Sequence, residues 1–351
     1  MNISKYAYVY ARIRARMGDI LSEGRLRTLI DAENKENFLS SLMESPYKDQ
    51  LMKATSKDLR NVEKALKEEL IDQYFMVIRS TRGEIREFFV DILRKFEVEN
   101  LKAIIREKTT TAVTTGEPLL FLSVETFFRR KISKLREVES VESVVKLLEK
   151  PYKDILEEVV PEYEKSKKVL ILEDALDKEI FGAIWRRIER LRAEDQKIVR
   201  RIIGTEFDIA NLMTLLRCIS AGVEEKEMRK YFLPYGYAFD FDSGEAKASI
   251  SAENLGSAIR LLPSTPYKEV LEKVLTIYRS RREKVLIPFE YALREFFFKT
   301  IKNMLKNYPI NIGTILGFLY LKEIEVKNLC AIAVCKENGI PAEEIAKIIM
   351  L

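Results

Sequence analysis

A short internal repeat constrains the fold of this chain more than any other feature of its sequence. Its first part is a Pro-Tyr pair followed by Lys and an acidic residue. Random order of 10 Pro and 15 Tyr predicts about 0.4 Pro-Tyr pairs, whereas the chain has four. Three of the four carry the Lys and the acidic residue, and they are Pro46-Tyr47, Pro151-Tyr152 and Pro266-Tyr267.

Two further short motifs follow each of these Pro-Tyr pairs in the same order. The second motif is an Ala-Leu pair with an apolar residue five positions after the Ala, beginning at Ala65, Ala175 and Ala292. The third motif is acid-apolar-x-Asn-Leu, in which the asparagines are Asn100, Asn211 and Asn328. The Ala-to-Asn distances are 35, 36 and 36 residues. Repetition at a nearly fixed period indicates an architecture built from similar units.

The period predicts three helical repeats, covering residues 1–117, 118–240 and 241–351. The two boundaries rest on segments rich in turn-forming and β-branched residues, 109–118 and 234–244. Each segment follows an Asn-Leu motif and precedes the next Pro-Tyr motif. We refer to these three stretches as the first, second and third repeats.

Apolar spacing predicts an all-α chain. Between residues 172 and 203, apolar residues recur at i, i+3 or i, i+4, with charged residues between them. Only residues 238–241 suggest a short extended piece. Charged residues make up 33% of the chain and His is absent, a composition that suits surface ion-pair networks in a protein from a hot environment.

The Pro-Tyr motif has the chemistry of a helix start. Ser45 and Thr265 suit the N-cap, and the prolines that follow them suit the first helical position, where a missing N–H costs nothing. The second repeat carries Lys150 at the cap position, so we expect its helix to fray there. Asn338-Gly339 predicts a helix end, and Pro341 predicts the start of a last short helix.

No motif for catalysis, cofactor binding or metal binding is found in the sequence. Without His, the Ser-His and Cys-His nucleophile pairs and the His-containing zinc sites are excluded. The three cysteines, Cys218, Cys330 and Cys335, cannot all pair, which suits a reduced, cytoplasmic setting, and Cys330 and Cys335 are expected to be buried free thiols. The most apolar stretch, residues 310–321, is shorter than the roughly 20 residues that a membrane-spanning helix needs.

Two basic clusters are the only candidate contact surfaces. One lies on a predicted amphipathic helix and the other follows the third Pro-Tyr motif. Basic faces of this kind can bind nucleic acid or anionic lipid, but interleaved acidic residues favour a solvated or protein-contacting face. The candidate residues are Arg186, Arg187, Arg190, Arg200, Arg201, Arg279, Arg281 and Arg282.

The three asparagines and a pair of glycines favour structural roles. Each Asn could cap a helix, or could be buried and bonded to a neighbouring helix end. A ligand-binding role would require three equivalent sites in one chain. Gly313 and Gly317, four residues apart, allow two helix backbones to approach closely, and we expect close packing inside a domain.

The two ends of the chain resemble a known family. Residues 6–15, Tyr-Ala-Tyr-Val-Tyr-Ala-Arg-Ile-Arg-Ala, and the stretch from Gly313 to Leu329 resemble the C subunit of the archaeal and bacterial V/A-type rotary ATPases, the counterpart of the d subunit of eukaryotic V-ATPases. The resemblance covers the whole chain and includes the three-repeat plan. Tyr10 departs from the family's tendency toward a smaller polar residue at this position.

The resemblance implies a fold, a role and partners. It implies three similar helical domains arranged as a funnel around a pseudo-threefold axis. It also implies a non-catalytic rotor subunit, which sits on the cytoplasmic face of a membrane proteolipid ring and holds the central shaft and its small stalk partner. Such a subunit needs no cofactor, small-molecule substrate or nucleic acid. The ion carried, proton or sodium, depends on other subunits.

Two other functions remain open on the sequence alone. One is a stand-alone helical-repeat scaffold that binds protein or nucleic acid through its basic faces. The other, a hydrolase with an unrecognised carboxylate site, lacks any convergent motif. The places where the repeats differ are Lys150, at the cap position, and Val334, where the other two repeats have Arg106 and Arg217.

Overall fold

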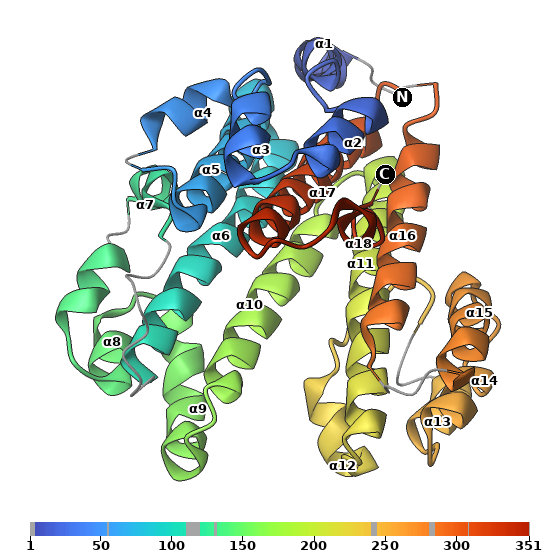
Figure 1. Ribbon diagram of the computed structural model, residues 1–351. Helices are drawn as coiled ribbons and strands as arrows, with labels where there is room; N and C mark the ends of the chain where they lie inside the picture. The colour runs from blue at the N-terminus through green and yellow to red at the C-terminus, as the bar shows by residue number, and fades with distance from the viewer. Residues whose placement is uncertain are drawn as a thin grey trace. The chain divides into compact units, whose positions relative to one another are not determined.

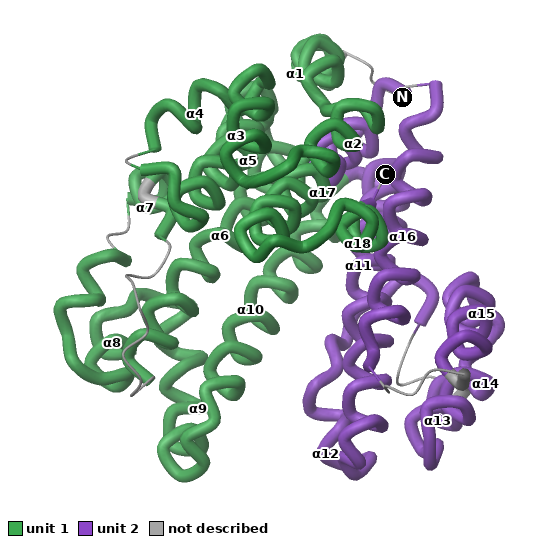
Figure 2. The backbone as a smooth tube through the Cα atoms, in the orientation of Figure 1, with its two compact units in different colours: residues 1–191, 322–349, 351 green, residues 192–321, 350 purple. Residues whose placement is uncertain are grey.

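Every regular element that the structure describes is a helix, which confirms the all-α prediction. The computed structural model describes residues 4–54, 56–109, 120–129, 132–239, 244–280, 285–307 and 309–350 (Figure 1). These residues fall into two compact units (Figure 2). Unit 1 contains residues 1–191, 322–349 and 351, and unit 2 contains residues 192–321 and 350.

Unit 1 begins with five helices, from α1 to α5. Tyr6, Val9 and Ile13, three and four residues apart on α1, form its buried face. Side-chain caps start three of the others, as in α5, where Asp58 accepts a hydrogen bond from the Asn61 backbone N–H. The helices are α1 (Ser4–Met17), α2 (Glu23–Asp31), α3 (Lys35–Leu42), α4 (Lys48–Lys53) and α5 (Leu59–Ser80).

The middle of unit 1 is built on two long helices, α6 and α10, which pack side by side (Figure 1). The buried face of α10 carries the predicted apolar series from Leu172 to Ile188. In the second repeat α9 packs against α10. The elements are α6 (Gly83–Thr109), α7 (Leu122–Phe128), η1 (Ile132–Glu137), α8 (Val141–Leu147), α9 (Tyr152–Ser166) and α10 (Leu170–Ile188).

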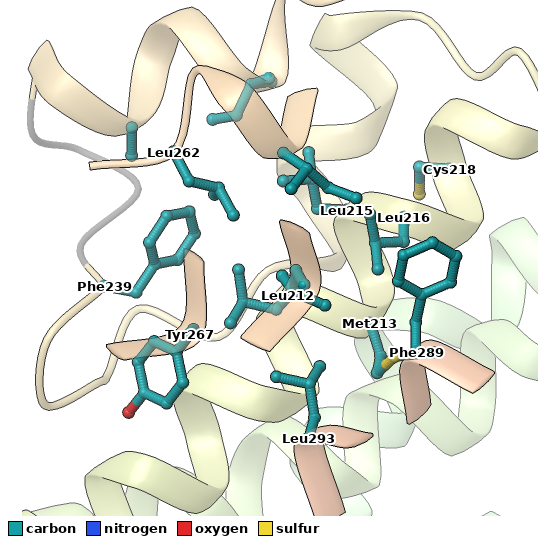
Figure 3. Packing of buried hydrophobic residues seen from close by; sticks show 14 of the residues in the cluster. Leu212, Met213, Leu215, Leu216, Cys218, Phe239, Leu262, Tyr267, Phe289 and Leu293 are labelled. Atoms are coloured by element: carbon teal, nitrogen blue, oxygen red, sulfur yellow. The ribbon is translucent and has the colours of Figure 1, made fainter. Parts of the chain in front are cut away.

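Unit 2 packs around the long helix α11. Leu212, Leu216, Tyr267 and Leu293 belong to one hydrophobic cluster that joins α11, α15 and α16 (Figure 3). Burial of this apolar surface is the main force that holds the unit together. Its elements are α11 (Ala193–Ser220), α12 (Glu225–Met228), η2 (Arg229–Tyr231), α13 (Gly244–Ile250), α14 (Leu255–Arg260), α15 (Pro266–Ser280) and α16 (Ile287–Met304).

The helix α17 (Ile312–Glu337) starts in unit 2 and ends in unit 1, and α18 (Ala342–Ala346) follows it. The predicted helix end is confirmed. Gly339 has a positive φ of 66°, and the Ile340 N–H bonds the Cys335 carbonyl oxygen, which closes the last turn of α17. Pro341 is the residue that precedes α18, as predicted.

The expected close packing at Gly313 and Gly317 is also confirmed, within unit 2. A Cβ atom at Gly313 would lie 2.8 Å from Cγ2 of Ile198. One at Gly317 would lie 3.0 Å from Cδ2 of Leu305. Both glycines therefore let α17 approach its neighbours more closely than any other residue would.

The three Pro-Tyr motifs start helices at different points. The third agrees with the prediction, because α15 begins at Pro266. In the first, α4 begins only at Lys48, although the Ser45 hydroxyl does accept a hydrogen bond from the Tyr47 N–H at 3.3 Å. The expected cap by Thr265 is wrong, since its hydroxyl is buried with no hydrogen-bond partner among the described residues.

In the second repeat, α9 begins at Tyr152 after a cis Lys150-Pro151 peptide. No side chain caps this helix, and the expected fraying stays a prediction. Lys150 instead pairs with Asp154 in the first turn, with 3.1 Å between Nζ and Oδ2.

The predicted joints between repeats lie only partly within the described residues. Residues 110–119 and 240–243 fall outside them, and with them most of the first joint and half of the suggested extended piece. The chain passes from one compact unit to the other at residues 191/192 and 321/322. The division into three repeats at residues 117 and 240 stays a prediction.

Cys330 and Cys335, which were expected to be buried, are half-buried, whereas Cys218 is buried. All three are free. Burial raises the pKa of Cys330 to about 12, so this thiol stays protonated at neutral pH.

Candidate functional site

The tyrosine of the first Pro-Tyr motif donates a hydrogen bond to a buried carboxylate far away in the sequence. The Tyr47 hydroxyl lies 2.5 Å from Oε1 of Glu325, and the two residues are 278 positions apart. Lys322 Nζ lies 2.7 Å from the same oxygen and 4.6 Å from the centre of the Tyr47 ring. The Leu21 N–H donates to the other carboxylate oxygen. Four groups from three segments thus meet at one buried ion pair.

The tyrosine of the second motif makes the same kind of bond. The Tyr152 hydroxyl lies 2.9 Å from Oε2 of Glu97. Arg94, three residues before Glu97, also reaches this oxygen, at 3.1 Å. Glu97 is 1% exposed, while the arginine side chain is 29% exposed, so this cation remains partly in water.

The third motif satisfies its carboxylate without a cation among the described residues. The Tyr267 hydroxyl lies 2.8 Å from Oδ2 of Asp208. The backbone N–H groups of Tyr237, Ala238 and Phe239 donate to the two carboxylate oxygens. Gly236 permits this wrapping, since a Cβ there would overlap Oδ1 of Asp208.

Burial keeps the tyrosines of the first and third motifs protonated. For Tyr47 and Tyr267, burial and then the neighbouring carboxylate raise the pKa well above its ordinary value. Burial also raises the pKa of Asp208, against the opposing effect of the hydrogen bonds that it accepts. A phenol that does not lose its proton serves as a hydrogen-bond donor rather than as an acid or base in catalysis.

The three bonds share an offset that sequence reasoning did not anticipate. The tyrosine of each repeat bonds the acid of the preceding repeat, and the first repeat takes its acid from the third. Both partners belong to the repeated motifs: the tyrosine follows each proline, and the acid lies three residues before each Asn. The threefold occurrence of both was the available signal. We call the three sites the Tyr47, Tyr152 and Tyr267 junctions.

The repeated asparagines stand next to these acids on the same helices. The Asn100 side chain exchanges two hydrogen bonds with the backbone of Phe121, at 3.2 and 2.8 Å. Asn211 does the same with Leu233, at 2.9 and 2.8 Å. Asn328 is likewise buried, with 3% of its surface exposed. The structure therefore shows asparagines bonded to the chain that leads into or away from a neighbouring short helix.

An ion pair also links a long helix of one repeat to the next repeat in two of three cases. Arg106 bonds Glu173 through two nitrogens, at 2.6 and 2.9 Å. Arg217 bonds Glu290 at 3.1 Å. At the equivalent position of the third repeat, Val334 is 43% exposed. The asymmetry that the sequence indicated at this position is present in the structure.

The first predicted basic face does not lie on a single helix, contrary to expectation. Helix α10 ends at Ile188 and α11 begins at Ala193, so Arg186 and Arg187 belong to unit 1, whereas Arg200 and Arg201 belong to unit 2. The physical reason lies in residues 194–195, where two acidic residues favour the positive end of a new helix.

Several of these arginines already have carboxylate partners. Arg187 contacts Asp91 at 2.7 Å and Glu84 at 3.2 Å. Arg186 contacts Glu179 at 2.9 Å, and Arg190 is exposed. In the second cluster, Arg279 belongs to α15, and Arg281 and Arg282 fall outside the described residues.

The described residues contain no group of three or more Cys, Asp or Glu side chains placed to hold a metal ion. None of the helices in that part of the chain is both long enough and apolar enough to cross a bilayer. The described polar groups that recur in the sequence, from the tyrosines to the asparagines, are used to join helices. Fold and junctions together define an all-α, internally repeated protein.

Comparison with known sequences identifies the family. The sequence model of the family "ATP synthase (C/AC39) subunit" matches residues 9–348, and this chain belongs to that family. Its relatives include the C subunit of the A-type ATP synthase of Methanocaldococcus jannaschii, which is 29% identical over 353 residues that cover 100% of this chain and 87% of the relative.

Two further relatives carry the same description. The C subunit of the A-type ATP synthase of Methanothermobacter thermautotrophicus is 29% identical over 97% of this chain and 86% of its own length. That of Pyrococcus abyssi is 24% identical over 98% of this chain and 90% of its own length. The family resemblance drawn from the two ends of the sequence is thereby confirmed.

Proposed function

We propose that this chain is a non-catalytic rotor subunit of an A/V-type ATP synthase or ATPase. It joins the membrane proteolipid ring to the central shaft and its small stalk partner, on the cytoplasmic side of the membrane. It turns with them while ions cross the membrane and ATP is made or hydrolysed. The observation that carries the proposal is the full-length match to the ATP synthase (C/AC39) subunit family.

The physical character of the chain supports a role in torque transmission. A coupling must be stiff, and close-packed helices with many fully buried side chains resist deformation. Buried polar contacts between repeats, such as Tyr152 with Glu97, add direction to the packing. Mixed charge on 33% of residues supplies polar faces that set partner choice and register.

We also retain the three-repeat plan, with repeats at residues 1–117, 118–240 and 241–351, as part of this proposal. The exposed arginines of α10 and of the connection to α11 are the candidate protein contacts. The alternative function, a scaffold that binds nucleic acid through a basic face, has less support. Arg187 is engaged by two carboxylates, and the arginines do not form one continuous helix face.

Co-purification tests the proposal. The tagged chain should be recovered with a detergent-solubilised proteolipid ring and with the central-stalk proteins. Moderate salt should not dissociate it from either partner. Binding to neither partner, under conditions that keep the rest of the complex assembled, would overturn it. The purified chain alone should not hydrolyse ATP. Salt-sensitive binding to DNA or RNA, without affinity for rotor parts, would support the scaffold instead.

A further inference from the structure

The three junctions have the same donor and acceptor types but differ in how the chain connects them. Tyr152 lies 55 residues after Glu97, and Tyr267 lies 59 residues after Asp208. Tyr47 lies 278 residues before its partner Glu325. Two junctions therefore join neighbouring parts of the chain, whereas the third joins its beginning to its end. Closing a loop of this length costs more conformational entropy than closing either of the two short loops.

We call the contact between residues 4–80 and residues 322–346, all in unit 1, the seam. There the chain from Leu21 to Tyr47, which includes α2 and α3, contacts the C-terminal part of α17 and α18. Three separate N-terminal segments converge there: Leu21 and Tyr47 both bond Glu325, and Lys35 pairs with Glu337 at 2.6 Å. Helix α18 packs against α2. Because Leu21 and Tyr47 share one carboxylate, they lose their partner together.

The centre of the seam is charged, unlike an ordinary hydrophobic contact. The side chains of Lys322 and Glu325 are 2% and 3% exposed and form an ion pair. Both side chains lie on α17, so opening the seam does not separate them. It lets water hydrate both charges, which offsets part of the hydrogen bonding lost from Tyr47 and Leu21. The polar bonds of the seam therefore specify one closed geometry, while hydration of the two charges lowers the free energy needed to open it.

The seam also lacks a contact that the other two junctions have. The Arg–Glu ion pairs at Arg106 and Arg217 have no counterpart at Val334. Glu63, the residue two before Ala65 and so equivalent to Glu173 and Glu290, pairs within its own helix with Lys67 at 2.6 Å. The outer edge of the seam is thus less tied than the outer edges of the Tyr152 and Tyr267 junctions.

From these differences we propose that the seam is a built-in opening point of the fold. It opens as one cooperative unit, separating the N-terminal helices from residues 322–346, while the Tyr152 and Tyr267 junctions stay closed. It allows one part of the chain to rearrange without unfolding of the rest. The proposal concerns this chain alone and does not depend on the proposed rotor role.

Native-state hydrogen exchange of the full chain tests the proposal, with a matched set of variants. Tyr47→Phe, Tyr152→Phe and Tyr267→Phe each remove one hydroxyl from one junction. Tyr47→Phe should raise the exchange rates of residues 23–42 and 322–346 by a common factor of about ten or more. Tyr152→Phe and Tyr267→Phe should leave both segments within about twofold of the wild type.

The wild type provides a second reading that no failure to fold can remove. With increasing urea below the unfolding transition, residues 23–42 and 322–346 should converge on one opening reaction. That reaction should require less urea than the opening of α11 and α16. Separate reactions for the two segments would overturn the proposal. So would an equal effect of all three Tyr→Phe changes on the seam.

Discussion

The Tyr47 and Tyr267 junctions compensate the charge of a buried carboxylate in two different ways. In both, a buried tyrosine donates to a buried carboxylate on a long helix. Lys322, three residues before Glu325, supplies a positive charge at the Tyr47 junction. The equivalent position at the Tyr267 junction is Thr205, and three backbone N–H groups take the place of the cation.

The comparison separates a feature that both repeats share, the hydrogen bond, from one that differs, the compensation of the carboxylate charge. The repeat keeps the tyrosine-to-carboxylate bond, while the source of the compensating charge changes with the loop that is available. Asp208 is one methylene shorter than a Glu, and Gly236 lets the backbone reach it. At Glu325, where the Leu21 N–H is the only backbone donor among the described residues, a lysine from the same helix neutralises the carboxylate instead.

The largest expected effect distinguishes compensation by a lysine from compensation by backbone N–H groups. Lys322→Met leaves Glu325 buried without its cation and should lower the free energy of unfolding by about 3–5 kcal/mol. Urea unfolding followed by circular dichroism, which reports on the helices of both units, measures the loss, and fluorescence of the single tryptophan, Trp185, reports on unit 1 alone. The matched change Thr205→Val removes a neutral hydroxyl that bonds the Arg201 carbonyl and also contacts the Tyr267 hydroxyl, and it should cost about 1 kcal/mol. Equal losses would show that Lys322 is not needed for charge compensation.

A somewhat smaller effect is expected at Asn100 and Asn211, which bond the backbone of a neighbouring segment in the same way. Asn100→Ala removes two hydrogen bonds and Asn211→Ala removes three, and each leaves a buried backbone N–H unpaired, for a loss of about 3 kcal/mol. Urea unfolding followed by circular dichroism measures both. Asn338→Ala, at an exposed side chain, is the control and should cost less than about 0.5 kcal/mol. Strongly unequal losses at the two buried asparagines would contradict an equivalent role.

The next expected effect depends on pH and is specific to the Tyr267 junction. Burial raises the pKa of Asp208, so the folded chain takes up this proton at a higher pH than the unfolded chain, whose carboxyl pKa is about 3.9. The contribution is fully present below the unfolded pKa and is lost as pH rises through the folded pKa.

Relative to Asp208→Asn, the wild type should therefore gain free energy of unfolding as the pH is lowered from 7 to 4. Urea titrations of both proteins at several pH values measure the difference. A difference that stays constant over this range, or that falls at low pH, would contradict the raised pKa.

The smallest effect concerns the outer ion pairs. The Arg217–Glu290 pair is largely exposed, so Arg217→Val should cost about 0.5 kcal/mol, or a shift in melting temperature of about 1–2 °C. The reverse change, Val334→Arg, should gain a comparable amount, because Glu63 would then have a second cation in addition to Lys67, as Glu290 has Arg217 in addition to Arg294. Thermal unfolding measures both. The absence of any gain at Val334 would contradict the idea that the seam's outer edge lacks a stabilising ion pair.

The sequence predicted the helices and their buried faces well. The periodic series on α10 and the buried positions of α1 follow from spacing alone, because a 3.6-residue period fixes which side of a helix is apolar. The positions of Gly313 and Gly317 and the helix end at Gly339 were also readable, since glycine marks close approach and positive φ.

The pairing of the motifs was beyond sequence reasoning. A period shows that a face is buried but not which segment covers it, so Tyr47 and Glu325 could not be matched across 278 residues. The break between α10 and α11 was missed because strong helix formers hide it. Glu194 and Asp195, in the first turn of α11, were its only local signal.

Gly313 and Gly317 fix the axial register of α17 within unit 2. A slide of one residue along the helix axis would move the backbone by about 1.5 Å and bring a side chain with a Cβ against Ile198 or Leu305. The Tyr320 hydroxyl, which donates to Glu206, marks the same register one turn further along. The first three turns of α17 therefore have a single axial position within unit 2, because a shift of even one residue would produce a steric clash.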